Sequence, residues 1–311
     1  MRTVAAAKIN WTLEVLGRRK DGYHEIRSVM QTIDLCDDVS VEPAAELRLE
    51  VDGQAGDEDD LALVAVRAFA AASGRDLGAT IRIRKRIPIA SGLGGGSSDA
   101  GAVLRCLNRL HGVGLSEEEL CSVAAMIGSD VTFFLTGGTG LAEGRGERVT
   151  ALPDVAETWL VLLTHGETMA GKTKRTYGAL SDGDFRDGSA TGRLVEAIRE
   201  SEVRGQRPEV GDQRSAIKGH QLRAGGGSVD VFENSFERAA NDVFEGHADA
   251  VAALMTAGVG ATWLAGAGPT VFGVAESEDE ARGIAGRVRE GMGVVHVART
   301  LPRAEATVVR D

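Results

Sequence analysis

The chain is predicted to fold as an α+β protein with two domains. Its 311 residues are more than one hydrophobic core usually supports, and this length alone indicates about two domains. Helical and strand-like patterns follow one another without the strict strand–helix–strand repeat of a doubly wound parallel sheet. We expect an N-terminal domain over residues 1–155 and a C-terminal domain over 156–311.

Strand-like runs open the N-terminal half, and helices follow them. Asp59 or Asp60 can cap a helix that stops at Gly74, a residue suited to the left-handed C-cap conformation. Ser116 and Glu119 have the spacing of a capping box, which predicts the start of another helix. The segment GSDVTFF is expected to be a loop beyond that helix. The strand-like runs lie at 4–16, 26–34, 39–41 and 47–51.

A glycine-rich loop, PIASGLGGGSSDA at residues 88–100, is the most informative segment of the chain. An alternating strand precedes it, and an amphipathic helix containing Val103, Leu104 and Leu107 follows it. Glycines can turn backbone N–H groups inward, and the N-terminus of the following helix also favours negative charge. The loop is therefore predicted to bind an oligophosphate.

A flexible Gly-Ser turn is the alternative for this loop, but a linker would need neither the strand nor the capped helix. The serine hydroxyls could also reach a phosphate oxygen or a magnesium ion. The predicted contacts are Pro88, Ile89, Ala90, Ser91, Gly92, Leu93, Gly94, Gly95, Gly96, Ser97 and Ser98.

The C-terminal half opens with a buried strand at 159–164. A polar stretch at 181–230, rich in Gly, Arg, Asp and Ser, is expected to form weakly ordered loops. Ser277 and Glu280 predict a second capping box, and GVVHVAR supplies a closing strand. The α-α-β-β-α-β order of this half fits a small open-faced sandwich. Its other elements are expected as helices at 233–245 and 247–257 and strands at 262–265 and 270–275.

A second candidate phosphate loop is GETMAGKT at 166–173, which matches the G-x-x-x-x-G-K-[ST] pattern and follows an apolar strand. A P-loop domain needs further parallel strands, one of them ending in an aspartate that holds magnesium, yet about 50 polar residues come next. A P-loop ATPase using Lys172 is therefore a minor alternative. Replacing Lys172 with Ala is expected to cause only a modest loss.

The composition limits the partners. A net charge of −11 argues against nucleic acid and anionic membranes as partners, although an anionic small molecule needs only a local positive pocket. Cys36, Cys106 and Cys121 form no CxxC pair and no metal-ligand spacing with the six histidines, so we expect reduced core cysteines and no metal held by the side chains alone. Without an apolar run of about 18 residues, a cytoplasmic location is expected.

Four segments together resemble the GHMP kinases. They are residues 5–35, the glycine loop, residues 127–147 and AGAGPTVFG at 265–273, so the resemblance covers nearly the whole chain. The DGYH segment and the three consecutive glycines are similar to the branch of that family that acts on a cytidine diphosphate derivative of methylerythritol. Mevalonate and homoserine kinases are the family's other relevant branches.

The resemblance implies a fold, an activity and cofactors. The N-terminal domain would be ribosomal-S5-like and bind ATP, the C-terminal domain would be ferredoxin-like, and the active site would lie between them. The enzyme would use ATP and Mg²⁺ to phosphorylate a tertiary 2-hydroxyl in the non-mevalonate route to isoprenoid precursors, as a monomer or weak homodimer. Another small-molecule GHMP kinase and a catalytically silent nucleotide-binding module are the alternatives.

Lys8 and Asp130 match the family's catalytic pair. Asp130 would accept or direct the hydroxyl proton, and Lys8 would keep Asp130 ionised and stabilise the charge that develops in transfer. Without the resemblance, Lys8 would more often be an edge lysine with an exposed ammonium, and Asp130 a turn former.

The resemblance also implies substrate contacts. Tyr23 and Tyr177 could sandwich the cytosine ring, while His24 reads its edge and Asn10 holds the erythritol-phosphate end. An ordinary half-buried aromatic is an equally good interpretation of Tyr177. Backbone N–H groups of a late glycine turn, at Gly266 and Gly268, could contact the substrate diphosphate. This turn departs from the family pattern, because Ala265 and Ala267 stand where serines are usual.

Overall fold

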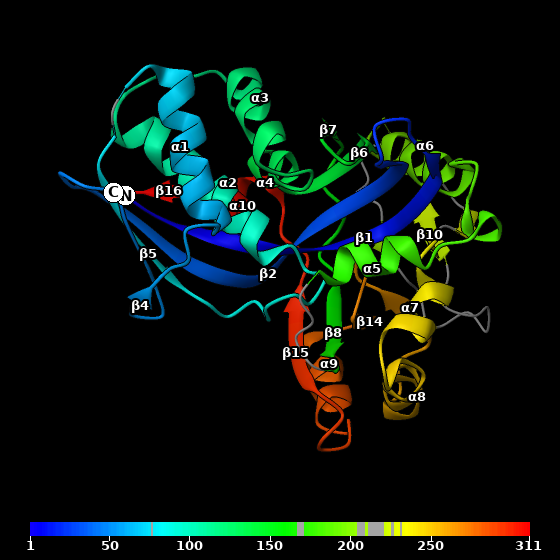
Figure 1. The fold of residues 1–311 in the computed structure, drawn as a ribbon. Coiled ribbons are helices and arrows are strands. Elements are labelled where there is room, and N and C mark those ends of the chain that lie inside the picture. The colour runs from blue at the N-terminus through cyan, green and yellow to red at the C-terminus, as the bar shows by residue number, and fades with distance from the viewer. Residues whose placement is uncertain (76, 167–170, 204–208, 211–220, 225–226, 231) are drawn as a thin grey trace.

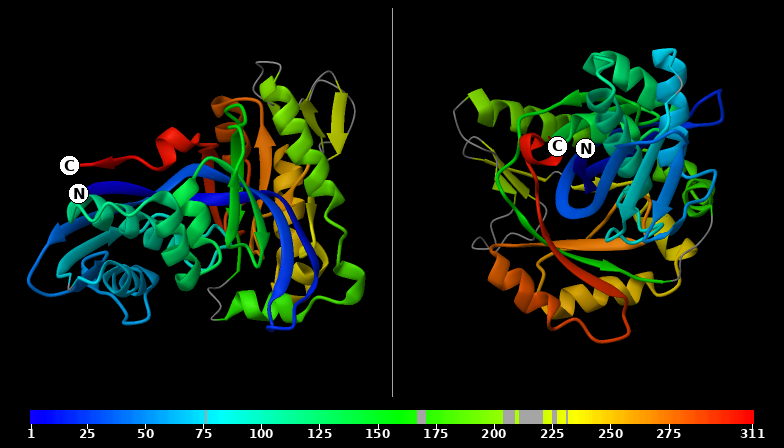
Figure 2. Two further views of the ribbon diagram at one scale, coloured as in Figure 1. Left: turned by 90° about the horizontal axis from the view of Figure 1, so that it is seen from above. Right: turned by 90° about the vertical axis from the view of Figure 1, so that its left-hand side faces the viewer.

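The computed structural model describes residues 1–311 apart from 76, 167–170, 204–208, 211–220, 225–226 and 231. Most of the N-terminal half forms one mixed sheet with helices packed against it (Figures 1 and 2). Two long antiparallel strands, β1 and β2, run through its centre. The elements of this half are β1 (Arg2–Arg18), β2 (His24–Pro43), β3 (Arg48–Val51), β4 (Gln54–Ala55), α1 (Leu61–Ser73), β5 (Ala79–Arg84), α2 (Gly95–Leu110), α3 (Glu117–Ile127), α4 (Val131–Thr136), β6 (Thr139–Gly144) and β7 (Arg148–Ala151).

The helix caps predicted in this half are confirmed. Asp60 caps α1, since its carboxylate accepts a 2.8 Å hydrogen bond from Ala62 N, and Gly74 ends the helix in the left-handed conformation. Ser116 and Glu119 form the full capping box at the start of α3. The segment after α3, expected to be a loop, contains the short helix α4, which buries Phe133 and Phe134.

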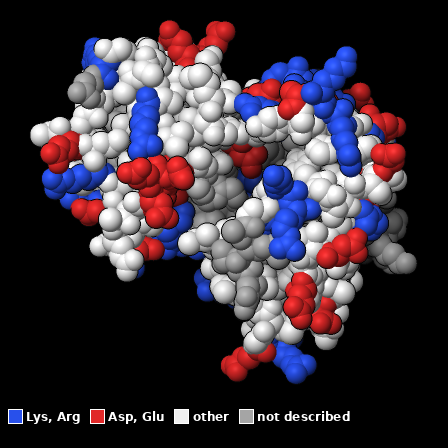
Figure 3. Space-filling view, viewed as in Figure 1, with Lys and Arg blue, Asp and Glu red and all other residues white. Residues whose placement is uncertain are grey.

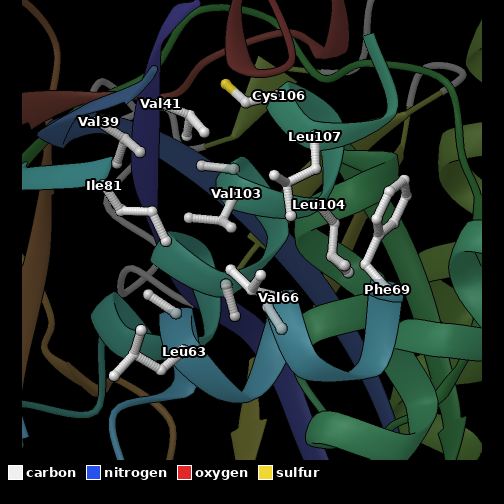
Figure 4. Packing of buried hydrophobic residues seen from close by; sticks show 14 of the residues in the cluster. Val39, Val41, Leu63, Val66, Phe69, Ile81, Val103, Leu104, Cys106 and Leu107 are labelled. Atoms are coloured by element: carbon white, nitrogen blue, oxygen red, sulfur yellow. The ribbon is translucent and has the colours of Figure 1, made fainter. Parts of the chain in front are cut away.

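A hydrophobic core anchors the helix that follows the glycine loop (Figure 4). Phe69 of α1, Leu104 of α2 and Ile81 of β5 are all completely buried in this core. Full burial of one such side chain contributes about 1.5–3 kcal/mol relative to exposure. The N-terminus of α2 is thereby held in a constant position relative to the sheet, and the preceding loop is held with it.

The C-terminal half contains a separate four-stranded sheet in the order β13-β14-β8-β15, with every neighbouring pair antiparallel. Helices α8 and α9 pack against it. The elements here are β8 (Trp159–Thr164), α5 (Lys172–Gly178), a 3₁₀ turn (Asp182–Asp184), α6 (Ser189–Val203), β9 (Glu209–Val210), β10 (Gln221–Ala224), β11 (Gly227–Asp230), β12 (Glu233–Asn234), α7 (Glu237–Val243), α8 (His247–Ala257), β13 (Trp263–Leu264), β14 (Thr270–Ala275), α9 (Glu278–Ala285), β15 (Val294–Arg299), α10 (Arg303–Ala306) and β16 (Val309–Arg310).

Two predictions for this half are wrong in detail. The polar stretch 181–230 was expected to form loops, but α6 occupies 189–203 and buries Leu194 and Ile198 against the central strands. Its apolar stripe is diluted by Gly, Ser and Thr, which lower helix propensity, so burial against the sheet stabilises the helix. Helix α7 begins at Glu237 instead of residue 233, because residues 233–234 pair with β1 as β12.

Strands from the second half complete the first sheet. Besides β12, the last strand β16 pairs antiparallel with the start of β1, which brings the two chain termini together (Figure 2). The predicted boundary near residue 155 therefore separates the two sheets only in part, because β12 and β16 from the second half belong to the first sheet. Among the helices that the structure describes, none is long and apolar enough to cross a membrane.

The antiparallel second sheet excludes the P-loop alternative. The strand before GETMAGKT is β8, whose neighbours β14 and β15 both run antiparallel to it. A P-loop requires a parallel sheet with the loop at the carboxyl ends of its strands. Residues 167–170 of this segment lie outside the described residues, and Lys172 begins α5.

Candidate active site

A cavity of about 1870 Å³ is lined by residues from both halves of the chain. Pockets for one small molecule usually measure about 300–1,000 Å³, so this cavity has room for two substrates. The glycine loop, the middle of β1, the start of α4, helix α5 and the late glycine turn all contribute to its wall. Basic and acidic side chains are interspersed on the face shown in Figure 3, so the −11 net charge does not form one continuous acidic patch there.

The glycine loop reaches this cavity as predicted. Gly92 and Gly94 have φ of 90° and 77°, values that favour glycine. Helix α2 begins directly after Gly94, whose lack of a side chain leaves the first N–H groups of the helix available to a ligand. A helix N-terminus with such free donors is a favourable place for phosphate.

Leu93 and Ser98 of the loop have side chains that face the protein interior. Leu93 is fully buried, and its carbonyl accepts a 2.9 Å hydrogen bond from Lys8 N. Ser98 is buried as well, and its hydroxyl donates to Ala6 O at 2.7 Å. The prediction that both serine hydroxyls could reach a phosphate or magnesium therefore has to be corrected for Ser98. Of the two serines, Ser97 is the one that lines the cavity.

The late glycine turn packs backbone to backbone against the first loop. Thr270 N donates to Ser91 O at 3.1 Å. A Cβ atom on Gly92 would lie 2.3 Å from Ala265 O, so this contact requires glycine. Gly266 and Gly268 are consequently held beside the glycine loop, although the two segments are far apart in the sequence.

Lys8 and Asp130 both line the cavity, close enough for their charges to interact. The Lys8 side chain is only 3% exposed, and its Nζ donates to Asn10 Oδ1 at 2.8 Å. Burial lowers the pKa of Lys8, and the negative charge of Asp130 opposes that change. Asn10 in turn donates to Ser28 Oγ at 2.8 Å, which orients the Asn10 oxygen towards the lysine. Asn10 thus contacts Lys8 directly, a role that sequence patterns did not indicate.

The aromatic residues predicted to hold a cytosine also line this cavity. Tyr177 lies 4.9 Å from the His24 ring and 4.7 Å from the Phe236 ring, measured between centroids. Tyr23 is 51% exposed, and the Arg145 guanidinium lies 5.1 Å from the centre of its ring. The structure therefore brings both tyrosines to one cavity, and the sandwich around a base remains a prediction.

Two family models match the chain. One describes the GHMP kinases N terminal domain and matches residues 60–138, and the other describes the GHMP kinases C terminal and matches 217–293. A protein of Dehalococcoides mccartyi named 4-diphosphocytidyl-2-C-methyl-D-erythritol kinase is 38% identical over 284 residues, which cover 90% of this chain and 91% of the relative. The chain belongs to the GHMP kinase family.

Further comparisons support the same family assignment. A protein of Symbiobacterium thermophilum with the same name is 38% identical, covering 95% of this GHMP kinase and 98% of the relative. A crystal structure of 4-(cytidine 5'-diphospho)-2C-methyl-D-erythritol kinase matches with a TM-score of 0.75 and 30% identity over 96% of this chain and 99% of the other. A crystal structure of L. major mevalonate kinase matches with a TM-score of 0.63 and 16% identity over 97% of this chain and 96% of the other, which shows the fold alone. The predicted two-domain GHMP kinase fold is confirmed.

Three cavity residues of this GHMP kinase were missed by sequence reasoning. Arg145 lies between two glycines in a turn and contacts Tyr23. Lys85 precedes the glycine loop, and Asp99 lies near the end of the loop segment, in the first turns of α2. Lys85 donates to both Asp37 and Asp99, and burial raises the pKa of Asp99 to about 8. The positions of Lys85 and Asp99 near the two ends of the glycine loop were the sequence feature that could have indicated their place in the cavity. The lysine and the carboxylates pair only because β2, β5 and α2 meet in space.

Proposed function

We propose that this GHMP kinase transfers the γ-phosphoryl group of ATP to the 2-hydroxyl of 4-diphosphocytidyl-2-C-methyl-D-erythritol, in the non-mevalonate route to isoprenoid precursors. The names of its relatives at 38% identity and the matching crystal structure support this substrate. The single observation that carries the proposal is the cavity itself. It brings the glycine loop, the Lys8 and Asp130 pair and the two tyrosines into one space large enough for both substrates.

Phosphoryl transfer needs positioning and charge stabilisation more than covalent chemistry. Asp130 takes the proton of the acceptor hydroxyl as its oxygen bonds to the γ-phosphorus and the bond to the bridging oxygen of ADP breaks. Lys8 stabilises the charge on the transferring group, and Asn10 orients the Lys8 ammonium through the 2.8 Å hydrogen bond. The contact between Lys8 N and Leu93 O holds this strand against the glycine loop.

The two substrates would occupy opposite parts of the cavity. ATP phosphates lie against the free N–H groups that follow Gly94, at the N-terminus of α2. The cytosine stacks on Tyr23 or Tyr177 and presents its edge to His24. The late glycine turn reaches the cavity wall at Gly266 and would contact the diphosphate of the acceptor.

Magnesium fits this site as an ion carried mainly by the phosphates. Among the described residues, no group of three or more His, Cys, Asp or Glu side chains could hold a metal ion. Mg²⁺ commonly keeps one or two protein ligands and completes its shell with phosphates and water. We propose further that the enzyme acts in the cytoplasm as a monomer or weak homodimer, with ATP bound mainly by residues 1–155 and the acceptor also contacted by 156–311.

The proposal is tested by replacing the general base. Asp130→Ala should lower kcat by more than about a hundredfold and leave the ATP affinity within about twofold. Asp59→Ala, an exposed replacement outside the cavity, is the matched control and should retain activity. Full turnover by Asp130→Ala would contradict the mechanism.

The acceptor is tested with the unmodified enzyme. ADP release should require 4-diphosphocytidyl-2-C-methyl-D-erythritol and should not occur with mevalonate, phosphomevalonate or homoserine. Comparable turnover of one of those would assign the enzyme to another branch of the family. ATP binding without any turnover would favour the catalytically silent module.

A further inference from the structure

Lys172 is a buried lysine in the cavity wall for which the proposed mechanism gives no role. It begins helix α5, its side chain is 7% exposed, and its Nζ donates to Gly268 O in the late glycine turn. One turn along the helix, Thr176 Oγ1 contacts Ala267 O at 3.4 Å. The N-terminal end of α5 is therefore attached to the late turn by two side chains.

The charges around Lys172 favour an anion. Burial, reinforced by the positive charge of Lys8, lowers the pKa of Lys172 to about 7. Asp130 acts on both ammonium groups in the opposite direction, so one carboxylate faces two buried cations. Burying like charges is costly unless a group of opposite charge compensates them, and a bound phosphate would do so. A bound anion would therefore stabilise the two buried ammonium groups.

The position of Lys172 relative to Tyr177 along α5 indicates which anion Lys172 would bind. Tyr177 is five residues after Lys172, about 7.5 Å along the helix axis at 1.5 Å per residue. In a cytidine diphosphate, a ribose separates the base from the first phosphate, and this is a comparable span. A base stacked on Tyr177 therefore brings its diphosphate near the Lys172 end of the helix. The side chains of Ala265 and Ala267 in the late turn carry no hydrogen-bond donor, so Lys172 would add a charged donor to the backbone N–H groups of that turn.

We propose that Lys172 binds the diphosphate of the cytidine-bearing acceptor at the late glycine turn, and so determines the affinity for that substrate. This inference rests on the proposed function, since it uses the same cavity and acceptor. Its role differs from that of a P-loop lysine, which would contact the phosphates of ATP. The sequence alone predicted a modest loss on replacing Lys172, and the buried position of its side chain now predicts a larger one.

The first test compares two probes, CDP and cytidine, by calorimetric titration of the full-length protein. The unmodified protein should bind CDP at least about tenfold more tightly than cytidine, since a hydrogen bond to a charged group contributes about 1.5–3 kcal/mol. Lys172→Ala and Lys172→Met should lose most of this difference and keep their affinity for cytidine. Arg175→Ala removes an exposed cation from the same helix and should keep the difference.

The second test is kinetic. Lys172→Met should raise the KM for the methylerythritol acceptor by about tenfold or more and change the KM for ATP by less than about twofold. A raised KM for ATP with an unchanged KM for the acceptor would overturn the proposal, and so would an equal loss of CDP and cytidine binding. If the unmodified enzyme fails to turn over the acceptor, the proposed function fails, while the comparison of CDP with cytidine still decides the role of Lys172.

Discussion

The contact between the two glycine turns makes a quantitative prediction for Gly92→Ala. The new methyl group would lie 2.3 Å from Ala265 O and 2.7 Å from Gly268 O, and both atoms belong to the backbone, so neither can rotate away. The residue would also keep a φ of +90°, which is strained for alanine. The conformational strain costs about 1–2 kcal/mol and the overpacking about 1–3 kcal/mol. We therefore expect the free energy of unfolding to fall by about 2–5 kcal/mol.

Gly53→Ala is the matched control, because Gly53 has a φ of +79° and, among the described residues, nothing within 4 Å of the added methyl group. It should lose only the conformational part, about 1–2 kcal/mol. Urea-induced unfolding followed by fluorescence and circular dichroism measures both variants under the same conditions. Equal losses for Gly92→Ala and Gly53→Ala, within about 0.5 kcal/mol, would refute the close packing of the two turns.

Two buried titratable groups predict opposite effects of pH on stability. His247 contacts His165 at 3.1 Å, and burial lowers its pKa to about 4. The unfolded chain binds more protons between pH 6.5 and 4, so stability should fall by roughly 2–3 kcal/mol as the pH decreases through this window. His247→Gln should reduce that slope in urea unfolding at pH 7 and 5. If the decrease in stability between pH 7 and 5 is the same in His247→Gln, the His165–His247 pair is not its source. Burial raises the pKa of Glu237 to about 7, so its contribution to stability declines as the pH rises from 4.5 through 7. Glu237→Gln keeps an acceptor for Leu264 N and should stabilise the protein by about 1–2 kcal/mol at pH 8, with little change at pH 4.5. A variant that is less stable at pH 8 would contradict this.

Several parts of the fold followed from short sequence patterns. Asp60 and Gly74 delimit α1, and the capping box of Ser116 starts α3, because a cap depends on residues within four positions of each other. Helix α6 was missed since its stability comes from burial against distant strands rather than from its own residues. The start of α7 was misplaced for a related reason, because residues 233–234 pair with β1.

In the candidate site, too, the features set by neighbouring residues were predicted and those set by packing were not. The glycine loop was predicted from its residues, while Ser98 was assigned to the phosphate although its hydroxyl bonds to Ala6 O. The rotation of α2 about its axis decides whether Ser97 or Ser98 faces the cavity. This rotation is set by packing against the sheet and cannot be read from the residue types. At 166–173, by contrast, the sequence matches the P-loop pattern but the structure does not support a P-loop. The pattern is complete, but the strand before it lies in an antiparallel sheet.

Local chemistry was enough to indicate an oligophosphate loop at the start of a helix, because the glycines and the helix N-terminus adjoin in the chain. Long-range contacts were needed to bring Lys8, Asp130 and Lys172 to one cavity, since these residues come from β1, the start of α4 and α5. The closure of the chain around two separate sheets determines their distances and burial, and burial alters the charge behaviour of Lys8 and Lys172. The sequence led us to expect Lys8 beside Asp130 only through the family resemblance, and it gave no sign that Lys172 joins them. The effect of burial on the pKa values of the two lysines depends on the tertiary structure.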